Sequence, residues 1–227
     1  MKTLYATFDK KQIPLLPQAQ FEGQIVVVET EPSARQSIAY LQQEPLLGID
    51  TETKPSFKKG ELHKVALLQV STHEVCFLFR LCKMGLPDCL KQLLSDERQL
   101  KVGLSLKDDI HALNRRGRYG VGNFLDLQTY VSRFGITDQS LQKLYANVMG
   151  GRISKSQQLT NWEAPKLTAA QQRYAATDAW ACLRIYETLE TLRQTEDYHF
   201  VPLIDQNRLA EDVAKELRLS VLHTPLP

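Results

Sequence analysis

Three apolar segments that follow one another closely constrain the fold of this chain more than any other feature. LLGIDTET (Leu46–Thr53) is followed, after a lysine-rich loop, by KVALLQVS (Lys64–Ser71) and VCFLFRL (Val75–Leu81). The last two segments are rich in β-branched, aromatic and aliphatic residues, and the three residues between them are typical of a β-hairpin. We therefore expect three antiparallel strands at the start of a sheet.

The pattern then changes to an alternation of helices and strands. A helix is expected over PDCLKQLLSDE (Pro87–Glu97), a short strand over LKVGLS (Leu100–Ser105) and another helix over KDDIHALNRR (Lys107–Arg116). Before the first strand, EPSARQSIAYLQQE (Glu31–Glu44) also has a helical pattern, and its proline suits a first helical turn. A strand meander followed by this alternation predicts an α/β fold with a mixed β-sheet flanked by helices.

The remainder of the chain is predicted to be mainly helical. SLQKLYANVMG (Ser140–Gly150) and the long segment Thr168–Gln194, which contains neither Pro nor Gly, both favour helices. Thr168 is the expected N-cap of the long helix, with Gln171 as its capping-box partner. The amphipathic segment Ile204–Leu219 predicts a C-terminal helix.

Composition narrows the class of protein. The 227 residues are 43% hydrophobic, which suits one domain over residues 1–227 with short extensions, although two small domains would also fit this length. No stretch approaches the ~20 apolar residues of a membrane helix, so a soluble, cytoplasmic protein without membrane contact is expected. The four cysteines suggest neither zinc nor a disulfide framework. The net charge of +2 means that any nucleic acid would bind a local patch.

Two carboxylates, Asp50 and Glu52, end the first apolar strand. Because side chains alternate along a strand, both emerge on the same side. Like charges at this separation repel, and burial raises both pKa values further unless a cation compensates. A divalent cation would compensate, whereas an ordinary loop start would leave both groups in water. The pair alone does not distinguish these alternatives.

Further acids occur in two later segments. Asp108 and Asp109 directly follow the second buried strand, and Tyr174 and Asp178 are four residues apart on one face of the long helix. Acids near a helix N-terminus are common for electrostatic reasons, so neither segment alone indicates a site.

Taken in order, GIDTET, VGLSLKDDIHAL and YAATDAW resemble the three motifs of the DEDD superfamily of 3′-5′ exonucleases, in the subgroup with tyrosine in the third motif. KVALLQVSTHEVCFLF and LTNWEAPKLTAAQQRYAATDAW are also similar to the exonuclease domain of the Werner syndrome protein and the nuclease domain of RNase D. The resemblance covers about Ile25–Leu192. It implies an RNase H-like fold for this core and a nuclease that hydrolyses phosphodiester bonds with two divalent cations, Mg²⁺ or Mn²⁺.

The resemblance also implies roles for individual residues. Asp50 would bridge both cations, Glu52 and Asp178 would complete the cation that binds the attacking water, and Asp109 would help to hold the cation near the leaving oxygen. Tyr174 would orient the water, since a phenol with a pKa near ~10 is a poor base at neutral pH.

The second motif leaves a choice between two neighbours, Asp108 and Asp109. Asp109 is favoured because Ile110 and Leu113 then take the buried helix positions of the family. The sibling subgroup carries a histidine five residues before its last aspartate, where this chain has Arg173, so no histidine receives a general-base role.

The implied reaction is stepwise release of nucleoside 5′-monophosphates from the 3′ end of DNA or RNA. The acids alone would equally serve an endonuclease or an RNase H-like nuclease, and the alternative of another class is a catalytically inactive nucleic-acid-binding module. Phe57 either stacks on a base or packs in its loop, and Trp162 is expected to pack. Basic residues near the motifs either contact phosphates or are ordinary solvated charges: Lys54, Lys58, Lys59, Arg115, Arg116, Arg118, Arg152 and Lys155.

Overall fold

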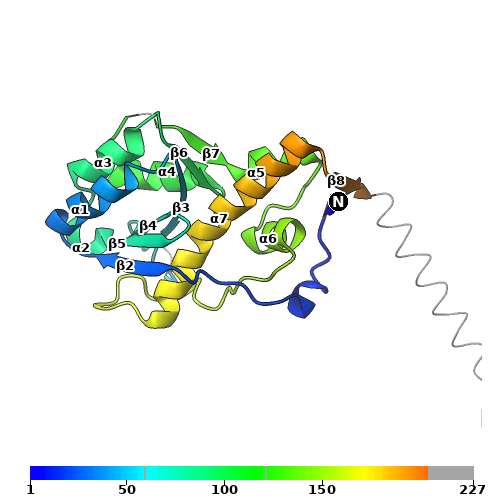
Figure 1. Ribbon diagram of the computed structural model, residues 1–227. Helices are drawn as coiled ribbons and strands as arrows, with labels where there is room; N and C mark the ends of the chain where they lie inside the picture. The colour runs from blue at the N-terminus through cyan, green and yellow to red at the C-terminus, as the bar shows by residue number, and fades with distance from the viewer. Residues whose placement is uncertain (59, 121, 204–227) are drawn as a thin grey trace, which may run out of the picture.

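A mixed β-sheet lies at the centre of the computed structural model, which describes residues 1–58, 60–120 and 122–203 (Figure 1). Within these residues six strands form the sheet in the order β2-β5-β4-β3-β6-β7. β3–β4 and β4–β5 are antiparallel, whereas β2–β5, β3–β6 and β6–β7 are parallel. The expected antiparallel start and mixed sheet are therefore confirmed. The strands are β2 (Gln24–Val28), β3 (Leu46–Glu52), β4 (Leu67–Ser71), β5 (Val75–Phe79), β6 (Leu100–Gly103) and β7 (Phe124–Asp126).

Helices lie on both faces of this sheet. On one face, Leu47 and Ile49 of β3 pack in a core with residues of the helices numbered α1, α3 and α4. On the other face α7 crosses the sheet diagonally (Figure 1). Successive side chains of a strand point to opposite faces of the sheet, and this alternation fixes the face that each side chain occupies. The helices are α1 (Glu31–Leu41), α2 (Leu81–Met84), α3 (Asp88–Ser95), α4 (Leu106–Arg116), α5 (Leu127–Tyr130), α6 (Leu141–Met149) and α7 (Ala169–Thr195), with 3-10 turns at Ile13–Leu15 and Val131–Phe134.

The long helix α7 begins as the sequence predicts. The Thr168 side chain accepts a hydrogen bond from the Gln171 backbone, and the Gln171 side chain accepts one from the Thr168 backbone. This capping box fixes the first turn of α7. The expected helix over Ile204–Leu219 lies outside the described residues.

The two ends of the described chain meet in a second, smaller sheet. β1 (Lys2–Tyr5) pairs in parallel with β8 (Tyr198–Val201), and Leu4 is fully buried in the core beside α6 and α7. The N-terminal segment, which the sequence suggests to be an extension, thus packs against the body. β2 and β7, which periodicity did not predict, complete the main sheet.

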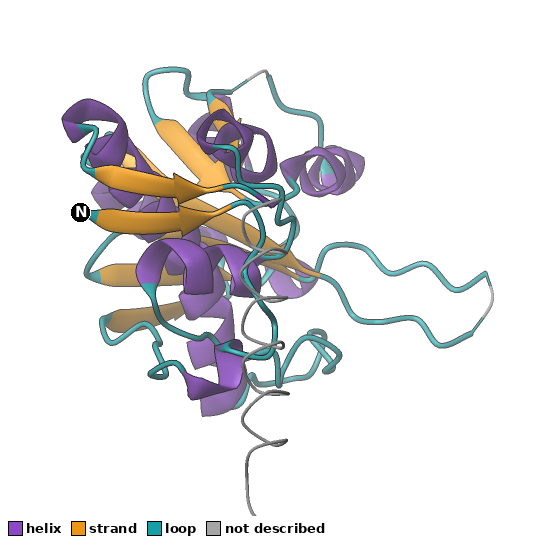
Figure 2. Cartoon of the chain, turned by 90° about the vertical axis from the view of Figure 1, so that its right-hand side faces the viewer, coloured by secondary structure: helices purple, strands orange, loops and turns teal. Residues whose placement is uncertain are grey.

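Two loops bear on the site. Residues 53–58 and 60–66 lie between β3 and β4, and the middle of this loop extends away from the body (Figure 2). Phe57 on this loop is 82% exposed, so it does not pack there, whereas Trp162 in the loop before α7 is fully buried beside Tyr174. The cysteines are free, and no helix among the described residues is long and apolar enough to span a membrane.

Candidate active site

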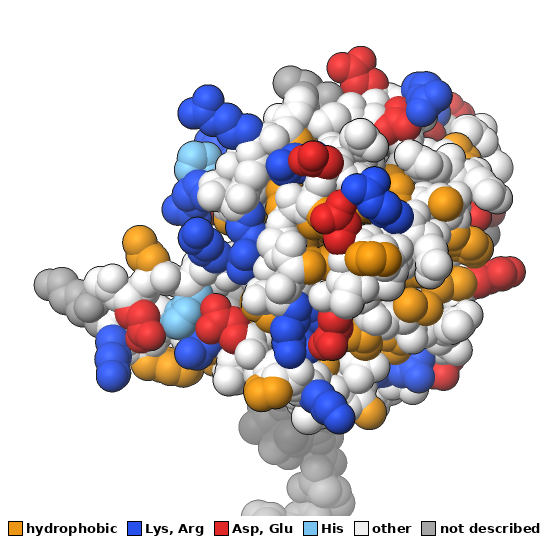
Figure 3. Space-filling view, turned by 90° about the vertical axis from the view of Figure 1, so that its left-hand side faces the viewer, with side chains coloured by type: hydrophobic (Ala, Val, Ile, Leu, Met, Phe, Trp, Pro, Cys, Tyr) orange, Lys and Arg blue, Asp and Glu red, His pale blue; other side chains and the backbone are white. Residues whose placement is uncertain are grey.

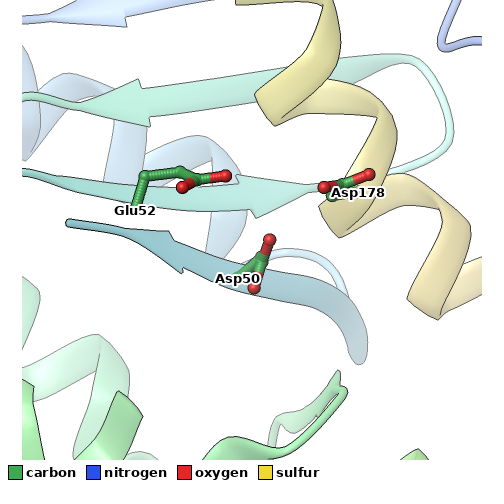
Figure 4. Close-up of side chains that lie close together, drawn as sticks. All are labelled: Asp50, Glu52 and Asp178. Atoms are coloured by element: carbon green, nitrogen blue, oxygen red, sulfur yellow. The ribbon is translucent and has the colours of Figure 1, made fainter. Parts of the chain in front are cut away.

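Three of the predicted site residues meet at the end of β3. Asp50 and Glu52 leave this strand on the face covered by α7, and Asp178 points toward them from that helix (Figure 4). One carboxylate oxygen of each residue lies within 4.8 Å of the others. Segments more than 120 residues apart in the sequence therefore contribute to one acidic cluster.

A glycine allows this close approach of helix to strand. A Cβ atom at Gly48 would lie 2.0 Å from the backbone oxygen of Ala179, the residue after Asp178. No side chain fits there, so Gly48 lets the α7 backbone contact β3 directly. The glycine in LLGIDTET thereby sets the distance between Asp178 and the two strand acids.

The surroundings of the cluster disfavour its charged forms. Burial, followed by the Asp178 and Asp109 carboxylates, raises the pKa of Asp50 well above its usual value. Burial and the Asp50 charge raise the pKa of Glu52 to about 10. Burial also raises the pKa of Asp178 to about 7, opposed by a hydrogen bond from Tyr174 and by the charge of Lys155. Uncompensated like charges in a buried site have this effect.

Tyr174 and Lys155 line the same cavity as the acids. This cavity has a volume of about 330 Å³, and its wall also includes Ser154 and Gln158. Burial, followed by the charges of Asp178 and Glu52, raises the pKa of Tyr174 above its usual value. Its hydroxyl therefore stays protonated at neutral pH and serves as a hydrogen-bond donor.

The second motif places its two acids differently. Asp109 lines the cavity, and its Oδ1 accepts a hydrogen bond from Thr51 Oγ1. Asp108 is exposed and is not part of the cavity wall. Asp109 lies outside the 4.8 Å group of three, although its charge contributes to the raised pKa values of Asp50 and Glu52. The structure thus brings Asp109, and not Asp108, to the other acids.

Two residues near the site were missed by sequence reasoning. Thr51, between the two strand acids, lines the same cavity and donates a hydrogen bond from its Oγ1 to Asp109 Oδ1. Gln69 on β4 is paired with Asp50 across the sheet, is fully buried, and has neither side-chain polar atom hydrogen-bonded. A single glutamine inside the apolar run VALLQVS is a signal that could have identified it, because buried amides normally have partners.

The donor set fits a divalent cation. All three clustered side chains offer carboxylate oxygens, which are the ligands that hard cations such as Mg²⁺ prefer. No Lys or Arg of the described residues forms a salt bridge with Asp50, Glu52 or Asp178. The buried acids thus need a positive charge that the described side chains do not supply at salt-bridge distance.

A comparison with protein families identifies this arrangement. The model of a family described as 3′-5′ exonuclease matches residues 25–193, which is most of the chain and includes all the acids above. The chain belongs to this exonuclease family. The resemblance seen in the three motifs is therefore confirmed, and so is the enzyme class, a 3′-5′ exonuclease, at the level of the family.

Individual relatives agree with the family match. Exonuclease 3′-5′ domain-containing protein 2 of Drosophila melanogaster is 37% identical over 145 residues, which cover 62% of this chain and 24% of the relative. The bifunctional 3′-5′ exonuclease/ATP-dependent helicase WRN of Mus musculus is 30% identical over 178 residues, covering 76% of this chain and 13% of the relative. The chain thus spans about a quarter or less of the length of these two exonuclease relatives.

A solved structure supports the fold. The Nibbler EXO domain of Aedes aegypti superimposes with a TM-score of 0.71 at 22% identity, covering 79% of this chain and 94% of that domain. The predicted RNase H-like fold, a mixed sheet flanked by helices, is confirmed by this exonuclease domain.

Proposed function

We propose that the chain is a 3′-5′ exonuclease that uses two divalent cations, Mg²⁺ or Mn²⁺, to hydrolyse the last phosphodiester at the 3′ end of DNA or RNA and release nucleoside 5′-monophosphates. The observation that carries this proposal is the cluster of Asp50, Glu52 and Asp178 beside Tyr174 in one cavity. The proposal treats the chain as one exonuclease domain with a core of about residues 25–192. Its cytoplasmic location stays a prediction.

The acids are proposed to hold the cations. Asp50, Glu52 and Asp178 offer the clustered oxygens, and Asp109, oriented by Thr51, completes the set. When bound, the cations would supply positive charge beside the attacking and leaving oxygens of the phosphodiester. The raised pKa values of the acids support this role, because a nearby cation restores the charged carboxylates.

Tyr174 is proposed to position the attacking water. Its hydroxyl is one helical turn before Asp178 and hydrogen-bonds to that carboxylate. Because it stays protonated, it donates hydrogen bonds and does not act as the base. Lys155, which also lines this cavity, offers an ammonium group to a phosphate oxygen.

Basic side chains suggest a path for the nucleic acid. Lys and Arg gather on the molecular face beside the loop that projects between β3 and β4 (Figure 3). Arg116 lines one surface cavity with Lys64 and Lys83, while Arg115 and Arg118 line another. Phosphate contacts of this kind give salt-dependent affinity. Exposed Phe57 is available for stacking on a base.

Two other basic residues, Lys54 and Arg152, have partners within the protein. Lys54 Nζ lies 3.8 Å from a Glu163 carboxylate oxygen, and Arg152 Nε donates to the Leu16 carbonyl at 3.0 Å. Lys59 lies outside the described residues. Lys54 and Arg152 are therefore weaker candidates for phosphate contacts.

The proposal is tested by digestion of 5′-labelled single-stranded and recessed-end DNA and RNA in the presence of Mg²⁺ or Mn²⁺. The expected result is a ladder that shortens from the 3′ end and is absent with D50A and D178A. Internal cuts by the unaltered protein would instead indicate an endonuclease. Binding without any cleavage would indicate the inactive binding module.

A further inference from the structure

A second cavity adjoins the acidic one. It has a volume of about 240 Å³ and shares two wall residues, Tyr174 and Ser154, with the cavity of the acids. Arg173 lines only this second cavity. The residue at the position of the sibling subgroup's histidine therefore faces away from the acids, into a separate space next to them.

Backbone contacts build the wall of this cavity. The N-terminal segment pairs with the loop before α7, where the Ala19 N–H donates to the Arg152 carbonyl at 2.9 Å. The Phe21 N–H donates to Thr177 Oγ1 at 3.1 Å, and the Thr177 hydroxyl in turn donates to the Arg173 carbonyl. These bonds hold the N-terminal segment against the first turns of α7.

The cavity offers positive charge and hydrogen-bond donors. Arg173 is half-buried, and its Nη1 donates to the Phe21 carbonyl. Across residues 1–58, 60–120 and 122–203 no carboxylate forms a salt bridge with it. Ser156 Oγ accepts bonds from Ser154 Oγ and Gln157 Nε2, which leaves its own proton for a ligand. A guanidinium without a counter-ion and a free hydroxyl donor suit an anion.

We propose that this second cavity binds the phosphodiester one nucleotide upstream of the scissile bond. The inference rests on the proposed function, which puts the scissile phosphodiester beside Asp178. Arg173 is five residues before Asp178 on α7, an axial rise of ~7.5 Å, which is the scale of one nucleotide unit. A guanidinium binds phosphate oxygens through two parallel hydrogen bonds. DNA and RNA share this phosphodiester chemistry.

The proposal predicts a dependence on substrate length. A dinucleotide has one phosphodiester and can occupy only the acidic cavity, whereas a trinucleotide has two and reaches Arg173 as well. Charge-assisted hydrogen bonds to the second phosphodiester should lower the KM of the trinucleotide about tenfold relative to the dinucleotide. Lengthening the substrate from a trinucleotide to a tetranucleotide should change the KM less than lengthening it from a dinucleotide to a trinucleotide.

The test compares steady-state hydrolysis of di-, tri- and tetranucleotides that carry a 5′-hydroxyl, as DNA and as RNA, by the unaltered protein, R173Q and R35Q. R35Q is the matched control, because Arg35 on α1 lines neither cavity and pairs with Glu31. R173Q should lose the trinucleotide advantage in KM while keeping the kcat and KM of the dinucleotide. R35Q should keep the advantage.

A second variant guards against misfolding, since Arg173 also contacts the Phe21 carbonyl. S156A removes the free donor without that contact and should reduce the trinucleotide advantage about threefold. If R173Q folds and keeps the full KM advantage of the trinucleotide, the inference is overturned. If R173Q does not fold, a full KM advantage in S156A overturns it. The inference is also overturned if the unaltered protein shows no lower KM for the trinucleotide than for the dinucleotide.

Failure of the proposed function has a different signature. In that case the unaltered protein hydrolyses none of these oligonucleotides with Mg²⁺ or Mn²⁺, and the length-dependent inference falls with it. If all three oligonucleotides are hydrolysed and R173Q has no effect on the KM advantage, only the role proposed for the second cavity is overturned. A benefit confined to DNA or to RNA would keep the inference and assign the cavity to that nucleic acid.

Discussion

Two buried acidic sites in this molecule have opposite surroundings. Asp138, 4% exposed, accepts hydrogen bonds from the Phe8 N–H at 2.8 Å and from Lys143 Nζ at 2.9 Å. Asp178, 7% exposed, lies among other carboxylates and receives a hydrogen bond from Tyr174. A carboxylate whose donors come from the protein serves the fold, whereas clustered carboxylates without a cation partner are suited to bind one.

The largest effect should come from D50N, which removes one of the three clustered carboxylates. If the cluster holds the catalytic cations, exonuclease activity should fall at least about 10³-fold, since the charge stabilisation of the transition state is lost. The metal-free variant should melt at or above the temperature of the unaltered protein, because a source of repulsion is gone. Labelled-strand digestion measures the activity, and thermal unfolding measures the stability. A loss of stability in D50N as large as that from a change at Asp138 would contradict the distinction between the two sites.

A smaller effect is expected from Y174F. The change removes only the hydroxyl that donates to Asp178. We expect kcat to fall about 10²-fold, as for the loss of a group that positions the reacting water, while cation binding and fold are retained. Single-turnover hydrolysis at saturating Mn²⁺ measures the step. Unchanged kcat would assign Tyr174 to packing, beside Trp162.

D138N is the matched change at the structural site. It leaves Lys143 without its anionic partner and weakens the contact with the Phe8 N–H. The free energy of unfolding should fall by about 2 kcal/mol, the usual cost of breaking a buried hydrogen-bonded charge. Activity below the melting temperature should be unchanged. Loss of activity without loss of stability would contradict a purely structural role for Asp138.

The pH dependence of stability should also separate the sites. Burial raises the pKa of Asp178 to about 7 and that of Glu52 to about 10, so the folded, metal-free protein binds more protons than the unfolded chain above about pH 4. The stabilisation is complete below the unfolded pKa values and is lost as the pH rises. The melting temperature should therefore fall by at least about 5 °C between pH 5 and pH 8.

Added Mg²⁺ should flatten this dependence, since cations replace the protons on the acids. D178N should show a shallower fall because an amide does not titrate, while D138N should keep the full slope. Differential scanning fluorimetry with and without EDTA makes the comparison. A melting temperature that rises between pH 5 and pH 8 in the metal-free protein would contradict the burial of uncompensated acids.

Local periodicity predicted the elements that carry the site. The two-residue period of a strand puts Asp50 and Glu52 on one face, and the helical period puts Tyr174 and Asp178 on another. The capping box at Thr168 was also predicted from the sequence. Each of these features depends only on neighbours in the sequence.

The meeting of these elements could not be derived from periodicity. It depends on the close packing of α7 against Gly48, a contact between residues more than 120 positions apart, and only the resemblance of the three motifs anticipated it. β2 and the β1–β8 pair were missed for a related reason. Their parallel partners are distant in the sequence, so no short turn signals them.

Calorimetric titration of Mn²⁺ into the unaltered protein, D178N and D138N at pH 7.5 tests the central claim most directly. The account predicts that the unaltered protein and D138N bind Mn²⁺ with the same stoichiometry and similar affinity, and that D178N loses binding or loses at least one site. Equal binding by D178N, or no binding by the unaltered protein, would contradict the assignment of the acidic cluster as the cation site.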